Sequence, residues 1–204
     1  MDTILEPIEI PEAFVAPAPV RHRSFYFENC IFLVEGTLFA IPKFRFQKLS
    51  PIFSAMFSVP TGDVVEGTSD SAPIVLEGVK KVDFERLLAI MYPTYEISSS
   101  AASSTSPLTT SEEWISVLKL ATLWEMEKIR KLAIHHLSCT GMLSSTQKVQ
   151  LAREYRVRKW FVEGITNITR SPTLENYSLE VLATELGWEA AAKILWINYP
   201  HKPL

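Results

Sequence analysis

The sequence predicts an α+β fold: a small β-sheet, made of an N-terminal hairpin plus one short strand, packs with helices and is followed by an all-α extension of helical hairpins. Three observations predict it. Residues 24–41 are dense in aromatic and β-branched residues around a central Glu-Gly pair, as in β-hairpins. Most of the remaining chain has apolar residues at the three- and four-residue spacing of amphipathic helices. In the C-terminal half, one helical pattern recurs at positions 120, 151 and 182, which favours stacked helical hairpins.

The strands of the hairpin are expected at Cys30–Val34 and Leu38–Ile41. The tight turn between them needs a residue with positive φ, which Gly36 supplies. Pro42 should end the second strand, because proline has no backbone N–H to donate to a ladder. A third short strand is expected at Ile74–Leu76, which lies between a proline and a glycine.

Two helices follow the hairpin in the first half of the chain. Ser50 and Pro51 form a helix start, with serine as N-cap and proline at the first helical position. Each helix has one apolar face, made of Phe53, Met56 and Phe57 in the first and of Phe84, Leu87, Leu88 and Met91 in the second. The polar, acidic segment between the two helices, residues 60–72, is predicted to be a surface loop.

Two segments lack the residues that build a core, and they divide the chain. Residues 1–20 carry four acidic residues, four prolines and no lysine or arginine, which predicts a disordered acidic leader that could serve as a docking peptide. Residues 98–111 are almost entirely Ser, Thr and Ala, which predicts a mobile loop. Thr110 and Glu113 then form a capping box for the next helix. We therefore expect a mixed domain over 21–140 and a helical extension over 141–204.

The repeated pattern has a fixed spacing of apolar positions. Leu120-Ala121-x-x-Trp124-x-Met126-x-x-Ile129 recurs from Leu151 to Trp160 and, more weakly, from Leu182 to Ala191. The small alanine lets one helix lie close to its neighbour, and the following apolar residues fill the bend of each hairpin. Capping residues agree with this division: Ser144 and Gln147 open the second unit, and Ser171-Pro172 or Thr173 could open the third.

The sequence contains no pattern typical of an active site. It has no GxGxxG, GxxxxGK[ST], GxSxG or HExxH motif. His135 and His136 are adjacent, so on a helix their side chains point about 100° apart and cannot share a metal ion. Cys30 and Cys139 are too few for a disulfide framework or a four-ligand zinc site. We therefore predict no catalytic, cofactor-binding or metal-binding residues, and no enzymatic activity.

Charge is unevenly distributed along the chain. The net charge is −3, which argues against a dedicated nucleic-acid binder, yet residues 114–170 hold ten Lys/Arg against four Glu. Four of these cations crowd one predicted hairpin bend: Arg153, Arg156, Arg158 and Lys159. They could form a basic patch for phosphate or RNA. The alternative is that they are the solvated outer face of stacked helices.

No targeting or membrane-spanning segment is apparent. The N-terminus lacks the basic start and continuous apolar stretch of a secretory signal and the arginines of a mitochondrial presequence. The longest apolar run, Cys30–Val34, is far short of the roughly 20 residues needed to cross a bilayer. We expect an intracellular protein, in the cytoplasm or the nucleus, without membrane contact.

Two motifs indicate a family. Phe39–Phe44, with the sequence FAIPKF, and Ser50–Phe57, with the sequence SPIFSAMF, resemble the centre of BTB/POZ domains, where a strand leads into a helix and an S-P-x-F-x-x-M-F stretch follows. Together with Phe25–Phe27 (FYF) and Leu151–Trp160 (LAREYRVRKW), the chain most resembles BTB proteins of mushroom-forming (basidiomycete) fungi. The resemblance covers residues 21–140 well and the helical tail more loosely.

The resemblance implies a BTB/POZ-like protein–protein interaction module that homodimerises and acts as an adaptor or scaffold without a cofactor. The residues that we expect at the dimer or partner interface are aromatic: Phe25, Tyr26, Phe27, Phe44 and Phe46. An exposed aromatic hairpin edge is a liability unless a second chain covers it. The alternative is that these aromatic residues fold back onto the chain's own helices.

Some BTB members are substrate adaptors of cullin-3 ubiquitin ligases, and others repress transcription. Cullin adaptors often carry an apolar-x-Glu triplet after the M-F helix, and the segment from Val64 to Glu66 fits it. An ordinary acidic loop is the alternative for these residues. A second function stays open: a nucleic-acid- or transcription-associated regulator that uses the basic bend at residues 153–159.

Overall fold

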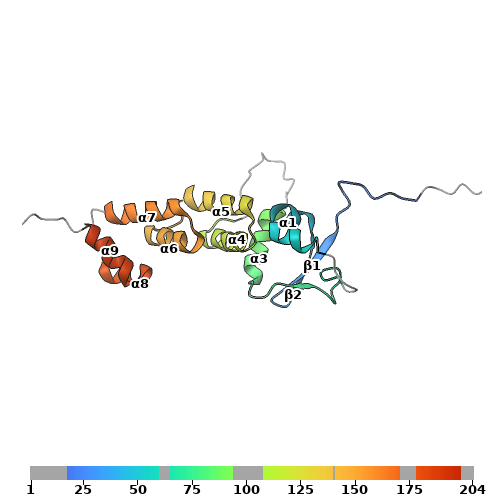
Figure 1. The fold of residues 1–204 in the computed structure, drawn as a ribbon, viewed down its shortest axis with the longest axis horizontal. Coiled ribbons are helices and arrows are strands. Elements are labelled where there is room, and N and C mark those ends of the chain that lie inside the picture. Colours follow the sequence, from blue (N-terminus) through green and yellow to red (C-terminus); the bar gives the residue numbers. More distant parts are fainter. Residues whose placement is uncertain (1–17, 60–64, 94–107, 140, 171–177, 199–204) are drawn as a thin grey trace, which may run out of the picture.

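The structure is a computed structural model that describes residues 18–59, 65–93, 108–139, 141–170 and 178–198. It confirms the α+β fold with a helical extension (Figure 1). The elements run β1 (Asn29–Val34), β2 (Thr37–Pro42), α1 (Phe44–Leu49), α2 (Pro51–Met56), β3 (Ile74–Val75), α3 (Lys81–Met91), α4 (Ser111–Leu123), α5 (Glu127–Cys139), α6 (Ser145–Tyr155), α7 (Arg158–Arg170), α8 (Leu179–Leu186) and α9 (Trp188–Asn198).

The sheet has the order β2-β1-β3, with β1 antiparallel to β2 and parallel to β3. The predicted hairpin is confirmed, and each of its strands is slightly longer than expected. Its two-residue turn holds both Glu35 and Gly36 at positive φ, 44° and 74°, which matches the right-handed twist of the strands. The two edges of this sheet are therefore β2 and the two-residue β3.

The core of the sheet end is a cluster of aromatic rings. Phe32 projects from β1 and is fully buried. Its ring centroid lies 5.1–5.8 Å from those of Phe46, Phe53 and Phe84, which are spacings at which aromatic pairs add to area burial. Trp124 joins the cluster 5.2 Å from Phe53. Helices α1, α2 and α3 and the end of α4 thus meet on one face of β1.

The predicted start of the helix α2 is confirmed. Ser50 is its N-cap and accepts a hydrogen bond from the Phe53 backbone N–H, with Pro51 at the first helical position. Phe53 is buried, whereas Met56 is exposed and Phe57 only half-buried. The helix ends at Met56, and Phe57, just beyond it, packs against the edge of the core, so the prediction of a three-residue apolar face is wrong for Met56.

The predicted helical hairpins are confirmed as α4–α5, α6–α7 and α8–α9, which follow one another along the long axis of the molecule (Figure 1). Each pair is joined by a residue with positive φ: Glu125 at 53°, Arg156 at 56° and Gly187 at 88°. These three positions are spaced by 31 residues, like the pattern itself. In the first two bends a backbone N–H donates to the carbonyl of the small alanine, from Met126 at 2.8 Å and from Val157 at 3.1 Å. The repeat is thus a repeat of bend geometry as well as of apolar positions.

The third hairpin departs from the prediction at two places. Its helix α8 is capped by Ser178, whose side chain accepts from the Val181 N–H. The predicted starts at Ser171-Pro172 and Thr173 lie outside the described residues, and the observed cap comes later in the chain. Trp188 occupies the bend position that is buried in the first two hairpins, yet 65% of its surface is exposed.

Two hydrophobic clusters hold the molecule together. The larger begins in β1 and continues without interruption past residue 140 to Tyr155 and Trp160. The smaller joins α6 and α7 to α8 and α9 through Val149, Ile168 and Leu182. The predicted border between the domain at 21–140 and the extension at 141–204 therefore does not mark a gap in the packing.

Part of the predicted mobile loop at 98–111 is corrected by the structure. Residues 98–107 lie outside the described residues, as do residues 1–17 of the predicted leader. Leu108, however, is buried in the core, and the N–H groups of Thr109 and Thr110 donate to the Glu113 carboxylate. Residues 108–111 are ordered because apolar burial and a capping box fix them.

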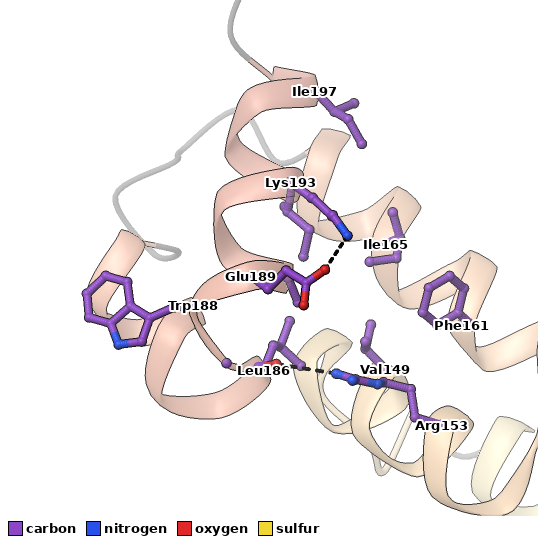
Figure 2. Close-up of a pocket in the computed structure, with 12 residues that line it drawn as sticks. Val149, Arg153, Phe161, Ile165, Leu186, Trp188, Glu189, Lys193 and Ile197 are labelled. Atoms are coloured by element: carbon purple, nitrogen blue, oxygen red, sulfur yellow. Dashed lines mark hydrogen bonds and ion pairs between the residues drawn. The ribbon is translucent and has the colours of Figure 1, made fainter.

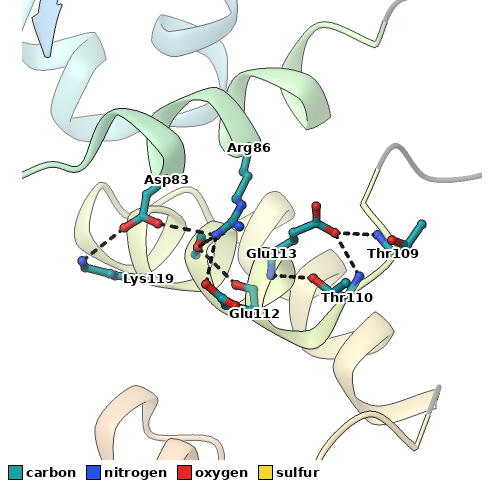
Figure 3. Close-up of polar contacts among 8 residues, drawn as sticks. Asp83, Arg86, Thr109, Thr110, Glu112, Glu113 and Lys119 are labelled. Atoms are coloured by element: carbon teal, nitrogen blue, oxygen red, sulfur yellow. Dashed lines mark hydrogen bonds and ion pairs between the residues drawn. The ribbon is translucent and has the colours of Figure 1, made fainter. Parts of the chain in front are cut away.

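Charged groups join α3 to α4 (Figure 3). Asp83 is buried and lies 3.3 Å from the Lys119 amine, and the Arg86 guanidinium donates to the Ser116 hydroxyl at 2.8 Å. A buried carboxylate is stable only when paired in this way. In the ranges that the structure describes, no helix is long and apolar enough to cross a membrane.

Candidate functional site

Aromatic side chains gather on the surface where the described chain enters the sheet. Phe25 is 76% exposed, and Tyr26, Phe27 and Phe44 are also exposed. The Phe27 and Phe44 rings stack with their centroids 4.8 Å apart. We call these four residues the aromatic surface. Phe27 therefore packs on a residue of α1, as the alternative of rings folding back onto the chain's own helices predicts, while all four side chains keep an exposed surface.

Polar contacts fix the path of the segment that carries the aromatic surface. The Glu28 carboxylate forms an ion pair with Lys43, and the Lys43 N–H donates to the Glu28 carbonyl at 2.9 Å. The Lys43 ammonium holds the pKa of Glu28 below its ordinary value. Upstream, the Arg21 guanidinium lies 4.6 Å from the centre of the Tyr26 ring, a cation–π distance. The backbone is thus tied to the start of α1 at Glu28, on the C-terminal side of Phe25–Phe27.

Phe46 is a correction to the predicted interface. Its side chain is 0% exposed and belongs to the aromatic core. Residues 44–49 form α1, and two positions apart on a helix point about 200° apart. With Phe44 turned outward, Phe46 must point inward, so it cannot present its ring to a partner.

The structure places only part of the predicted cullin-contact segment. Val64 lies outside the described residues, whereas Glu66 is exposed. Glu66 lines a small hollow of about 150 Å³ together with Met56, Phe57 and Val59 at the end of α2. The adjacent Gly67 packs so closely on β1 that a Cβ atom there would lie 2.7 Å from the Cys30 sulfur. That close approach fixes where Glu66 is displayed.

The four cations of the predicted basic bend do not act as one set. The Arg153 guanidinium donates to the Leu186 carbonyl of α8 at 3.3 Å. Lys159 lies 3.6 Å from the Glu163 carboxylate, one turn further along α7. Arg156 and Arg158 are exposed at the bend itself. Arg153 therefore contacts the third hairpin, whereas Lys159 pairs within α7.

Arg153 and Leu186 both line a groove that the sequence did not indicate. It has a volume of about 600 Å³ and lies between α6 and α7 on one side and α9 on the other (Figure 2). Its walls include Phe161, Ile165 and Ile197. The signal that could have found it is the apolar run at 194–197, which holds more apolar residues than one helix face can bury.

The histidines and cysteines form no reactive centre in the described structure. The His136 ring stacks on Trp114, 4.1 Å between centroids, and burial lowers its pKa. Cys30 is buried, which raises the pKa of its thiol to about 11. Cys139 lies 3.7 Å from a nitrogen of His135 on the exposed end of α5. Within the described ranges, no three His, Cys, Asp or Glu residues are placed to hold a metal ion.

Comparison with known proteins gives one match. A family model described as the BTB/POZ domain matches residues 21–140. No curated protein matches the chain. The matched range contains the sheet, the aromatic surface and the helices from α1 to α5. The resemblance to proteins of mushroom-forming fungi stays a prediction.

Proposed function

Because the chain belongs to the BTB/POZ family, whose domain is a protein–protein interaction module, we propose that it is a non-enzymatic, self-associating adaptor or scaffold. The aromatic surface is the region through which two copies associate, and the helical hairpins extend from it to reach other proteins. Both parts of this proposal concern binding and need no cofactor.

The exposure of the aromatic surface is the observation that carries the proposal. Phe25, Tyr26, Phe27 and Phe44 expose ring surface to solvent, and one ion pair and one backbone hydrogen bond between Glu28 and Lys43 hold the chain next to Phe27. Contiguous apolar rings on a fixed backbone mark interaction sites more often than isolated exposed residues do. Beside them lies the edge strand β2, which a second chain can cover. A twofold arrangement would bury the same rings on both copies.

Co-expression of two differently tagged copies tests self-association. We expect two tagged copies of the unchanged chain to co-purify. The double change Phe25→Ser with Phe27→Ser should reduce the amount of recovered partner about tenfold or more, since aromatic anchors dominate interface energies. Leu123→Ser removes an exposed apolar side chain from the end of α4 and serves as the matched control. Equal recovery of the double variant and the unchanged chain would contradict this role of the aromatic surface.

The finer part of the proposal is that one partner is cullin-3. Its support is the exposed Glu66 beside the apolar hollow at the end of α2, together with the resemblance of this segment to the apolar-x-Glu triplet of adaptors. Binding of the purified N-terminal domain of cullin-3, measured by calorimetry, should weaken about tenfold or more in Glu66→Lys and stay unchanged in Glu77→Lys. Absence of binding by the unchanged chain would remove cullin-3 from the proposal and leave self-association standing.

Nucleic-acid binding has less support. It requires the cations at 153–159 to act on one phosphate backbone, whereas Arg153 donates to α8 and Lys159 pairs with Glu163. We therefore do not propose it as a second function.

A further inference from the structure

We infer that the groove between α7 and α9 binds a short peptide segment that combines an apolar helical face with a carboxylate, contributed by a partner protein. This inference rests on the proposed adaptor function and adds a binding site at the end of the molecule opposite the sheet (Figure 1). The site is built from the second and third hairpins.

The shape of the groove suits an elongated occupant. Its α9 wall consists of residues spaced by one, three and four positions, so one whole face of that helix is turned to it: Glu189, Ala190, Lys193, Ile194 and Ile197. A face of that length spans about 12 Å, or two turns of helix. The opposite wall repeats with helical spacing as well, with Val149 and Arg153 on α6 and Phe161 and Ile165 on α7. An amphipathic helix can lie in a groove whose two walls present residues at helical spacing.

The groove is apolar along its floor and at one rim. Ile194 is buried at the floor, whereas Phe161 is 44% and Ile197 is 62% exposed. Figure 2 shows Phe161, Ile165 and Ile197 along the open space between the helices; Trp188 also lines the groove. The volume of about 600 Å³ falls in the range of ligand sites, which is enough for several large apolar side chains. Covering these exposed rings and branched side chains with apolar side chains of a partner removes apolar surface from water and so stabilises the complex.

Arg153 determines the charge of the occupant. Its guanidinium lies at the groove and uses one donor on the Leu186 carbonyl, whereas a guanidinium has five N–H donors. Among the described residues, no carboxylate oxygen lies within the 4.0 Å ion-pair distance of Arg153. A carboxylate on the occupant would pair with these donors in a partly apolar setting, where charge-assisted hydrogen bonds are strong.

The other charges of the groove do not cancel this preference. Glu189 is paired with Lys193 one turn further along α9, and the Lys193 ammonium, with a smaller effect from Arg153, lowers the pKa of Glu189. The two partners of this pair neutralise each other, so the groove keeps the net positive charge of Arg153. The occupant is therefore acidic rather than neutral or basic.

Selection of random 12-residue peptides displayed on phage, with the full chain as bait, tests this inference. Enriched peptides should carry apolar residues at helical spacing and at least one Asp or Glu. A synthetic, fluorescein-labelled copy of an enriched peptide should bind the chain in anisotropy titrations. Phe161→Asp and Arg153→Glu should each weaken that binding about tenfold or more.

Two matched variants serve as controls. Val162→Asp places a charge on the exposed neighbour of Phe161 that does not line the groove, and Arg158→Glu reverses a cation at the bend outside it. Both should bind the peptide like the unchanged chain. Enrichment of neutral or basic peptides, no enrichment, or equal loss of binding in the controls would overturn the inference.

Self-association measured on the same variants separates this site from the proposed function. Phe161→Asp and Arg153→Glu should co-purify with a tagged second copy as well as the unchanged chain does. If they lose self-association along with peptide binding, the groove is an interface between copies and the inference of a separate partner is wrong. If peptide binding holds while the unchanged chain fails to self-associate, the proposed function fails and the groove does not.

Discussion

Ser50 forms two hydrogen bonds that join parts of the chain far apart in sequence. Its hydroxyl oxygen accepts from the Phe53 N–H and so caps α2. The same hydroxyl donates to the Trp124 carbonyl at the end of α4, at 2.6 Å, inside the core. One side chain thereby fixes the aromatic cluster against the first helical hairpin.

Replacement of Ser50 by alanine should lower the free energy of unfolding by about 2–4 kcal/mol, because it removes an N-cap and leaves a buried carbonyl without its donor. Ser178→Ala, which removes only the cap of α8, should cost about 1 kcal/mol. Urea unfolding followed by circular dichroism measures both. Equal losses for the two variants would show that the bond to Trp124 contributes nothing.

Glu113 makes stability depend on pH. Hydrogen bonds from the backbone N–H groups of Thr110 and Thr109 hold the pKa of its carboxyl below its ordinary value of 4.5. Because the folded-state pKa is the lower one, this stabilisation is complete above the unfolded-state pKa and is lost as the pH falls through the folded-state pKa.

The melting temperature of Glu113→Gln should therefore lie below that of the unchanged chain at neutral pH, and the difference should shrink towards about pH 3. Thermal unfolding at a series of pH values measures it. Glu112→Gln leaves the capping box in place and is the control. A difference that stays constant down to the acid end of the series would contradict this role of the Glu113 carboxylate.

At the scale of elements, the close packing of α6 on α7 depends on Gly164. A Cβ atom at this position would lie 2.7 Å from the Ser145 carbonyl oxygen and 2.7 Å from a methyl group of Val149. A backbone oxygen cannot move aside as a flexible side chain can. Glycine is therefore required here in spite of its poor helix propensity.

Gly164→Ala should destabilise the protein by about 1–3 kcal/mol, the usual cost of overpacking, although the same change in an open helix stabilises it. Asn167→Ala, at an exposed position of α7, is the control and should be neutral or slightly stabilising. Chemical denaturation compares the two variants. A stabilising effect of Gly164→Ala would show that the two helices can separate at little cost.

The elements that the sequence predicted best are those whose signal is local. The Glu35-Gly36 turn, the serine cap at Ser50 and the spacing of the three bends each depend on a few neighbouring residues, and the structure has all of them. The pairing of β1 with β3 was not predictable in the same way, because only the folded chain brings Ile74 beside Phe32.

The site was less predictable than the fold, because it depends on which way side chains turn. Positions 44 and 46 are both phenylalanine and have similar neighbours in sequence. Only the helical conformation of α1 exposes the Phe44 ring and buries the Phe46 ring. Arg153 belongs by sequence to a basic bend, yet its contact with Leu186 places it in the groove beside α9. Such contacts come from the stacking of one hairpin on the next.

At the scale of the whole molecule, the two candidate interaction regions lie at opposite ends of an elongated chain (Figure 1). The aromatic surface is at the sheet end, and the groove between α7 and α9 is at the end of the third hairpin. Between them, the hydrophobic core continues from β1 to α7. A scaffold of this shape can associate with a second copy through one end while the other end remains accessible to a different partner.

Sedimentation velocity of the full chain over about 1–100 μM tests self-association most directly. We predict a concentration-dependent shift from one chain of 23.1 kDa to a species of twice that mass, and no such shift in the Phe25→Ser, Phe27→Ser double variant. A single species of one chain's mass at every concentration of the unchanged protein would contradict the proposal that its aromatic surface joins two copies.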